Sequence, residues 1–129
     1  MTAFRLAHLS DIHFGGENRE ALAAATDWMA GEALDLVVVS GDLTRYGEVA
    51  EFRAAAAWLE SLPHPRFVTP GNHDAPYLAW AERIVAPFRR YERHIGPAAA
   101  QEWRGGGVAV RGGNTARGAQ PRRTWLCEI

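Results

Sequence analysis

Residues 36–43 read LVVVSGDL, a run of aliphatic and β-branched residues that ends in a glycine and a carboxylate. A continuous apolar run of this kind is typical of a strand in a parallel sheet that is covered on both faces. Two further runs have the same form: Phe4–Leu9 is followed by SDIH at 10–13, and Phe67–Thr69 by PGNHD at 70–74. Each predicted strand therefore ends in side chains that can bind a metal ion.

Helical segments separate the predicted strands. Leu22, Ala25 and Met29 recur at helical spacing within residues 20–33, and Asn18 is a suitable cap for that helix. A second apolar stripe precedes two prolines, and it consists of Phe52, Ala55, Leu59 and Leu62. The order strand, helix, strand, helix, strand predicts an α/β fold with a mainly parallel sheet and flanking helices.

The three polar clusters are evenly spaced, with 31 positions from Asp11 to Asp42 and 30 from Asp42 to Asn72. A strand-helix-strand unit needs about 30 residues, so each cluster lies one such unit beyond the last. Because the carboxyl ends of parallel strands lie along one edge of the sheet, these residues are expected to be neighbours. His13 lies two positions after Asp11, so an extended segment would project both side chains to the same side. The second oxygen of Asp42 could bridge to another ion.

Composition limits the classes of function. The chain has 129 residues, 47% of them hydrophobic, and a formal net charge of −1, which fits one globular domain without a surplus of positive charge for nucleic acid or membrane surfaces. Cys127 is the only cysteine, so no intrachain disulfide can form. The sequence shows neither a signal-peptide pattern nor an apolar run of about 18 residues. We expect a cytoplasmic protein with no membrane span.

The clusters also carry a resemblance to a known family. DIH at 11–13, GDL at 41–43 and GNHD at 71–74 resemble the first three of the five signature blocks of the calcineurin-like metallophosphoesterases. Their flanking text (HLSDIHFG, GDLTRYG, VTPGNHD) is most similar to the bacterial branch that includes cyclic-nucleotide phosphodiesterases. The resemblance implies hydrolysis of a small phosphodiester or phosphomonoester substrate by metal-activated water, with divalent ions such as Mn, Fe or Zn as cofactors.

The resemblance also implies roles for individual residues. Asp11 and His13 would bind the first metal ion, Asp42 would bridge both ions, and Asn72 would bind the second. Mixed imidazole, carboxylate and amide ligands accept several divalent cations, so the sequence does not identify the metal.

The expected catalytic residues lie in the third cluster. His73 would act beside the phosphate, stabilising or protonating the leaving oxygen, and Asp74 would orient the His73 ring.

Other parts of the family pattern are absent. The Gly-His and Gly-His-x-His blocks of the family's second half do not occur, so we expect the second metal site to be weakly occupied or vacant, with one ion bound rather than two. Residues 1–94 would form one half of a four-layer α/β/β/α sandwich, and the inner face of its sheet would have nothing to pack against. We expect either a truncated copy of a longer enzyme, which we favour, or a homodimer formed through that face.

The remaining residues, 95–129, are rich in glycine and arginine and are expected to form loops, with a fourth strand at 107–110. Two alternative functions stay open. A non-catalytic metal-binding remnant or scaffold would explain the absence of the later histidines. A DNA-repair-type nuclease of the same family would explain the opening HLSDIHFG, although the near-neutral charge favours a small-molecule substrate over nucleic acid.

Overall fold

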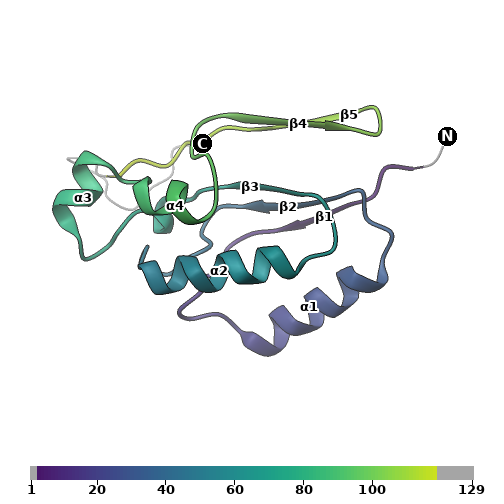
Figure 1. The fold of residues 1–129 in the computed structure, drawn as a ribbon, viewed down its shortest axis with the longest axis horizontal. Coiled ribbons are helices and arrows are strands. Elements are labelled where there is room, and N and C mark those ends of the chain that lie inside the picture. The colour runs from purple at the N-terminus through teal and green to yellow at the C-terminus, as the bar shows by residue number, and fades with distance from the viewer. Residues whose placement is uncertain (1–2, 119–129) are drawn as a thin grey trace.

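A computed structural model describes residues 3–118 of the chain. Its main sheet contains three parallel strands in the order β1-β2-β3. These are β1 (Leu6–Leu9), β2 (Leu36–Ser40) and β3 (Arg66–Thr69). Two connecting helices, α1 (Arg19–Gly31) and α2 (Val49–Ser61), both lie on one face of the sheet (Figure 1). The predicted α/β class and the predicted order of elements are confirmed.

Local chemistry explains where the two long helices begin. The side chain of Asn18 accepts a hydrogen bond from the backbone N–H of Ala21, which confirms the predicted cap of α1. At the start of α2, the Glu51 carboxylate accepts from the N–H of Glu48, so an otherwise unpaired N-terminal donor is satisfied. Both helices are thereby fixed at the end that follows a polar cluster.

The core lies between the sheet and these helices. Alternating residues of β1 and β2 face the helices, and Ala7, Val37 and Val39 are buried there. The predicted stripe of α2 packs against them, with Phe52 and Ala55 fully buried. Full burial of one such large aliphatic or aromatic side chain contributes about 1.5–3 kcal/mol relative to exposure. This packing fixes the positions at which the strands end.

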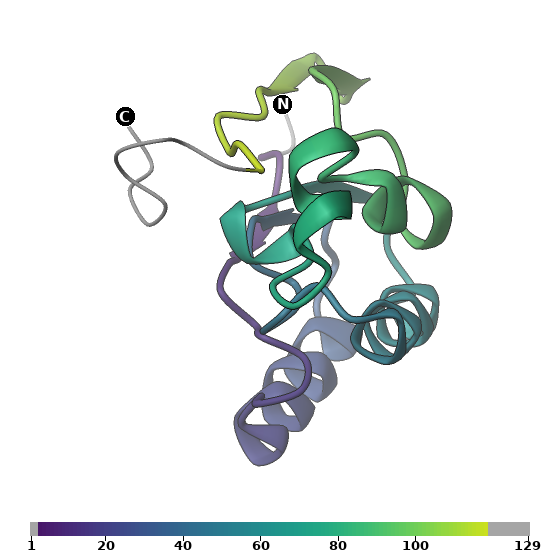
Figure 2. The same cartoon turned by 90° about the vertical axis from the view of Figure 1, so that its left-hand side faces the viewer.

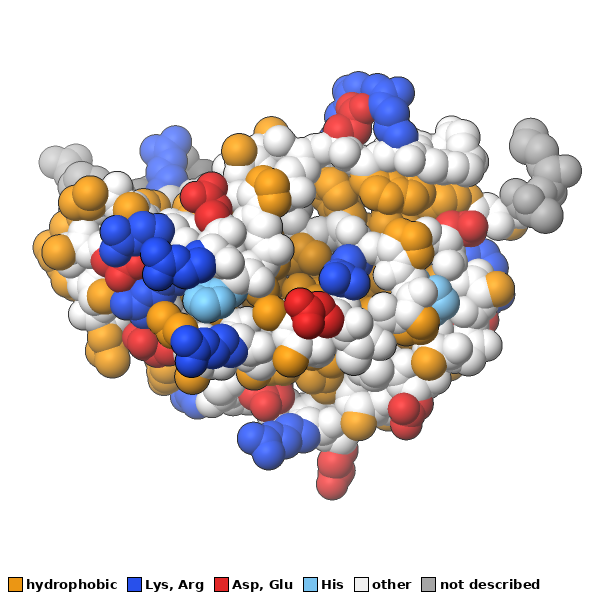
Figure 3. All heavy atoms as spheres, viewed as in Figure 1, with side chains coloured by type: hydrophobic (Ala, Val, Ile, Leu, Met, Phe, Trp, Pro, Cys, Tyr) orange, Lys and Arg blue, Asp and Glu red, His pale blue; other side chains and the backbone are white. Residues whose placement is uncertain are grey.

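A β-hairpin lies over part of the opposite face of the sheet (Figures 1 and 2), while Leu6 and His8 of β1 stay exposed on that face. Its strands, β4 (Gln101–Gly105) and β5 (Val108–Gly112), pair antiparallel with each other. The Trp103 ring lies 5.6 Å from the Phe4 ring, and the side-chain amide of Gln101 donates to the Val68 carbonyl at 3.1 Å. Hydrophobic side chains line the underside of the hairpin (Figure 3).

The hairpin corrects two predictions. The hairpin packs on Val68 and Phe4, so the second face of the sheet is not wholly bare as expected, but Leu6 of β1 remains 43% exposed there. The homodimer expected through this face stays a prediction. β5 overlaps the strand predicted at 107–110, but it pairs with β4 and not with the parallel sheet, so residues 101–105 and 108–112 are strands and not loop. Glycines at the turn concealed the short alternating strands. Residues 119–129 of this region, Cys127 included, lie outside the described part of the chain.

Three short elements lie near the carboxyl ends of the parallel strands. They are a 3₁₀ turn (Asn72–Asp74), α3 (Trp80–Val85) and α4 (Arg89–His94). Figure 2 shows α3 and α4 stacked beside the end of the sheet. Among the described residues, no helix is both long enough and apolar enough to cross a membrane.

Candidate metal centre

The backbone at the strand ends has an unusual conformation. Asp11, His13 and Asp42 have φ angles of 57°, 54° and 53°, and within residues 3–118 they are the only non-glycine residues with positive φ. A left-handed conformation costs an ordinary residue about 1–3 kcal/mol, and such residues cluster at functional sites. The conformation therefore has to be maintained by its surroundings.

Backbone hydrogen bonds between two loops maintain it. The N–H groups of residues 11, 13 and 14 donate to the carbonyls of Gly41, Asp42 and Leu43 at 3.2, 3.0 and 2.7 Å. The segment after β1 thus runs beside the segment after β2 beyond the end of the sheet. This pairing brings Asp11 and Asp42 together, as the parallel topology predicted. His13 joins them although its segment is left-handed at residues 11 and 13 and not extended as expected.

The three side chains form a group that could hold one ion. One ligand atom from each lies within 4.8 Å of the others. His13 Nε2 is 3.9 Å from Asp11 Oδ1 and 3.9 Å from Asp42 Oδ2. The Asp42 side chain is only 14% exposed, whereas that of Asp11 is 65% exposed. The group is thus anchored on the protein side at Asp42 and open to solvent at Asp11.

The tautomer of His13 suits metal binding. Its Nδ1 lies 3.2 Å from the carbonyl oxygen of Thr44. A carbonyl can only accept, so Nδ1 carries the hydrogen and Nε2 presents its lone pair toward the two carboxylates. Metal-binding histidines in proteins are commonly oriented in this way by a carbonyl on the other ring nitrogen. The residues present therefore fit a divalent cation.

The third loop closes on Asp42 at Gly71. A Cβ atom at position 71 would lie 2.2 Å from Asp42 Oδ1, so only glycine allows this approach. The backbone N–H of His73 donates to the same oxygen at 3.0 Å. Residues on both sides of Asn72 therefore contact Asp42, which is consistent with the predicted neighbourhood, while binding of a second ion by the Asn72 amide stays a prediction.

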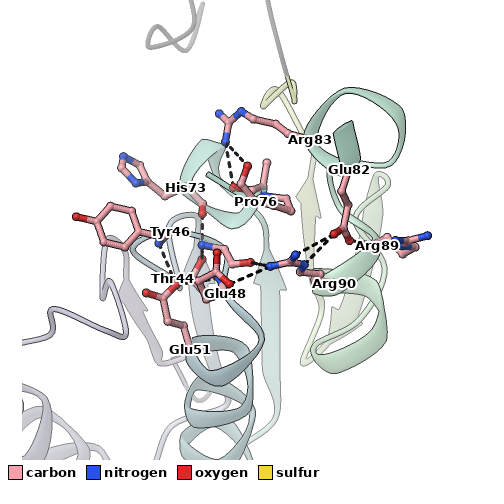
Figure 4. Close-up of polar contacts among 12 residues, drawn as sticks. Thr44, Tyr46, Glu48, Glu51, His73, Pro76, Glu82, Arg83, Arg89 and Arg90 are labelled. Atoms are coloured by element: carbon pink, nitrogen blue, oxygen red, sulfur yellow. Dashed lines mark hydrogen bonds and ion pairs between the residues drawn. The ribbon is translucent and has the colours of Figure 1, made fainter. Parts of the chain in front are cut away.

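His73 lies beside His13, with the two ring centres 4.9 Å apart and the ring planes at 88°. Its Nδ1 is 2.8 Å from the carbonyl oxygen of Arg45 and must donate to it. Figure 4 shows the His73 ring on the same side as the Tyr46 ring, pointing away from the helices. In this tautomer, Nε2 of His73 carries the lone pair and can accept a hydrogen bond or a proton.

Asp74 does not hold the His73 ring, so the predicted role of this carboxylate was wrong. Asp74 is fully buried and accepts from the N–H groups of Leu43, Thr44 and Gly71 at 3.2, 2.9 and 2.9 Å. The hydroxyl of Thr44 is 2.9 Å from it as well. Burial raises the pKa of Asp74 above its ordinary value, although these donors act in the opposite direction. Its function is to tie the second and third loops together.

Two site residues escaped the sequence prediction. Thr44 and Arg45 orient the two histidines, and they do so through backbone carbonyls. No side-chain pattern reports such a contact. The only signal was their position directly after the GDL cluster.

The protein thus has an α/β fold with two aspartates and a histidine, which could together hold a cation, at the carboxyl edge of a parallel sheet. The family model for calcineurin-like phosphoesterases matches residues 4–122. The chain therefore belongs to the calcineurin-like phosphoesterase family, a class of metal-dependent enzymes.

Curated relatives are phosphodiesterases. The chain is 38% identical to the glycerophosphodiester phosphodiesterase GpdQ of Enterobacter lignolyticus, over 54% of this chain and 29% of that protein. It is 28% identical to the 3',5'-cyclic adenosine monophosphate phosphodiesterase CpdA of Escherichia coli, over 67% of this chain and 36% of the relative. It is 30% identical to a probable cyclic nucleotide phosphodiesterase of Synechococcus, over 55% of this chain and 31% of that protein. The chain thus spans about a third of the length of the relatives it matches.

Proposed function

We propose that this chain supplies the amino-terminal part of a phosphoesterase active site that hydrolyses a small phosphodiester or phosphomonoester. The observation that supports this best is the convergence of Asp11, His13 and Asp42, held in strained backbone conformations by the adjacent loop. Strain of this kind persists only where surrounding structure maintains it, and this part of the chain matches the family model.

The chain's own residues have separate tasks in this proposal. Asp11, His13 and Asp42 hold one divalent cation such as Mn, Fe or Zn, and Asn72 contributes to a weaker second site. Bound cations would activate water and offset the charge of the phosphate oxygens. His73 donates Nδ1–H to the Arg45 carbonyl, so it can give or take a proton only at Nε2, facing the leaving oxygen.

The substrate class proposed is a small phosphodiester, because the relatives are named for glycerophosphodiester and cyclic nucleotide substrates. The chain's near-neutral net charge of −1 supports a small substrate over nucleic acid. A non-catalytic metal-binding role is the second candidate, because the chain covers only about a third of the relatives' length.

Metal-stripped protein with added Mn²⁺ and bis-p-nitrophenyl phosphate tests the proposal. We expect turnover in the unaltered chain and none in Asp42→Ala, which removes the best-anchored ligand. Asp27→Ala is the matched control, because Asp27 is an exposed carboxylate on α1. A Mn²⁺ titration run in parallel separates the candidates: binding without turnover, in a folded sample, would favour the non-catalytic role.

His73→Ala tests the division of tasks. We expect the rate to fall by about 10²–10⁴ while Mn²⁺ affinity is kept, as for loss of a general acid. Loss of the metal in this variant would contradict the assignment of His73 to the substrate.

A further inference from the structure

Two consecutive peptide groups orient the two histidines of the site. The Thr44 carbonyl accepts from His13 Nδ1, and the Arg45 carbonyl accepts from His73 Nδ1. Both carbonyls belong to the short connection Thr44–Glu48 between the second cluster and α2, which we call the orienting loop. Because the two carbonyls are consecutive in the chain, a shift of this loop as a whole would disturb both rings.

The orienting loop is fastened at its start and to α2. Thr44 Oγ1 accepts from the N–H of Gly47 at 3.1 Å. Glu51 Oε2 accepts from the N–H of Tyr46 at 2.9 Å and from that of Glu48 at 3.1 Å (Figure 4). Gly47 has a φ of 67°, and a Cβ there would lie 2.7 Å from the backbone carbon of Ala75, so the loop also packs closely on the chain after the third cluster.

The Tyr46 carbonyl accepts from the N–H of Tyr77 at 2.8 Å. The end of the loop is bound by Arg90, which comes from α4. Its Nη1 donates to the Gly47 carbonyl at 3.0 Å and lies 3.2 Å from Glu48 Oε2. Its Nε and Nη2 donate to Glu82 Oε2 at 3.1 and 2.9 Å. Figure 4 shows the guanidinium between the loop and Glu82. The side chains of Arg90 and Glu82 are 18% and 15% exposed.

We propose that Arg90 is a positioning residue of the phosphoesterase site, which fixes the Nδ1–H tautomers of His13 and His73 by holding the orienting loop against Glu82. A guanidinium carries donors in a rigid fork, so one edge can bind Glu82 while Nη1 reaches the loop. The loop carbonyls then stay aimed at the imidazoles.

Neighbouring arginines show that this arrangement is specific to position 90. Arg89 is on the same helix, but its side chain is 64% exposed and its one ion pair, to Glu82 Oε1 at 3.4 Å, does not involve the loop. Arg83 donates to the carbonyls of Ala75 and Pro76 at 3.0 and 3.2 Å, outside the orienting loop. Arg89→Gln is therefore a matched control, with the same chemical change on the same helix.

The test is ¹⁵N NMR of the imidazole nitrogens in the metal-free full chain, because the chemical shifts of a neutral ring distinguish its two tautomers. We expect Nδ1–H rings at His13 and His73 in the unaltered protein and in Arg89→Gln. In Arg90→Gln the ratio of Nε2–H to Nδ1–H should rise by about fivefold at both, the effect of weakening one hydrogen bond. Arg90→Lys should restore part of the original ratio. Unchanged tautomers in a folded Arg90→Gln protein would overturn the inference.

A second arm depends on the metal site proposed above. Mn²⁺ affinity should fall by about threefold to tenfold in Arg90→Gln. This loss is smaller than the roughly tenfold to hundredfold loss for a direct partner of a metal ligand, because Arg90 acts through the loop. If no variant binds Mn²⁺ while the tautomers still respond to Arg90, the proposed function fails and the positioning role stands. Should Arg90→Gln not fold, Glu82→Gln replaces it and should shift both tautomer ratios in the same direction; unchanged ratios there would overturn the inference.

Discussion

The rim of the parallel sheet and the β4–β5 hairpin are held by different kinds of interaction. At the rim, buried Asp74 accepts hydrogen bonds from two loops, and Arg90 is largely covered. On the hairpin, the ion pairs of Glu102 with Arg104 and Arg111 lie on the solvent side, where both arginines are mostly exposed. Exposed pairs contribute about 0–1 kcal/mol, whereas a buried donor left without a partner costs about 1–3 kcal/mol. Stability and site geometry should therefore depend on the rim.

The largest effect should follow from Asp74→Ala. Removing this carboxylate leaves the buried N–H groups of Leu43, Thr44 and Gly71 without their acceptor, at a cost of about 3 kcal/mol or more. Urea unfolding measures the loss. The control is Asp35→Ala, an exposed carboxylate that accepts from the Arg5 N–H, and it should cost below about 1 kcal/mol. Equal losses in both variants would contradict the contrast between rim and surface.

Gly71→Ala should rank second. The added Cβ would lie 2.2 Å from Asp42 Oδ1, so Asp42 must move, and we expect a loss of about 1–3 kcal/mol together with at least about tenfold weaker Mn²⁺ binding. Isothermal titration calorimetry and urea unfolding give the two values. Gly96→Ala is the control, since nothing lies within 4 Å of a Cβ there. Unchanged Mn²⁺ affinity in Gly71→Ala would argue against Asp42 as a ligand.

A third change addresses the hairpin itself. Trp103→Ala removes a half-buried ring that packs 5.6 Å from Phe4, so we expect about 1–2 kcal/mol of destabilisation with Mn²⁺ affinity unchanged. Arg104→Ala, on the opposite face of the same strand, should change stability by less than about 0.5 kcal/mol. A fall in Mn²⁺ affinity with Trp103→Ala would mean that hairpin and rim are coupled.

The smallest effect concerns pH. Hydrogen bonds from Arg90 lower the pKa of Glu82 below its ordinary value. The folded state therefore binds this proton more weakly than the unfolded state, so the stabilisation is present above the unfolded pKa and is lost as pH falls through the folded one. Glu82→Gln should remove up to about 1 kcal/mol at pH 7 and nothing at pH 2.5. Thermal unfolding at both pH values checks this; an equal loss at both would show that the charge is not responsible.

Much of the main sheet could be predicted because its signals are local. The run of Val37 to Val39 and the helical stripe through Phe52 and Ala55 each report burial within a few residues, and Asn18 reports a helix start. The meeting of Asp11 and Asp42 follows from parallel topology. These inferences need no knowledge of distant contacts.

The remaining features depend on partners far apart in the sequence. Arg90 binds Gly47 across 43 positions, and the buried acceptor role of Asp74 depends on N–H groups 30 and 31 positions away. The left-handed conformation of His13 also depends on such a partner, because its N–H donates to the carbonyl of Asp42. Short helices such as α3 and α4 also carry too few residues for a clear periodicity.

Orientation of the two imidazoles by peptide carbonyls has an evolutionary consequence. Every residue has a carbonyl, so position 45 could change its side chain in related sequences without losing the acceptor for His73. What selection must preserve there is the course of the main chain, and hence residues such as Gly47 and Arg90 that shape it. Variation at position 45 would then be free to alter the surface beside the two imidazoles, and a changed side chain there need not disturb their orientation.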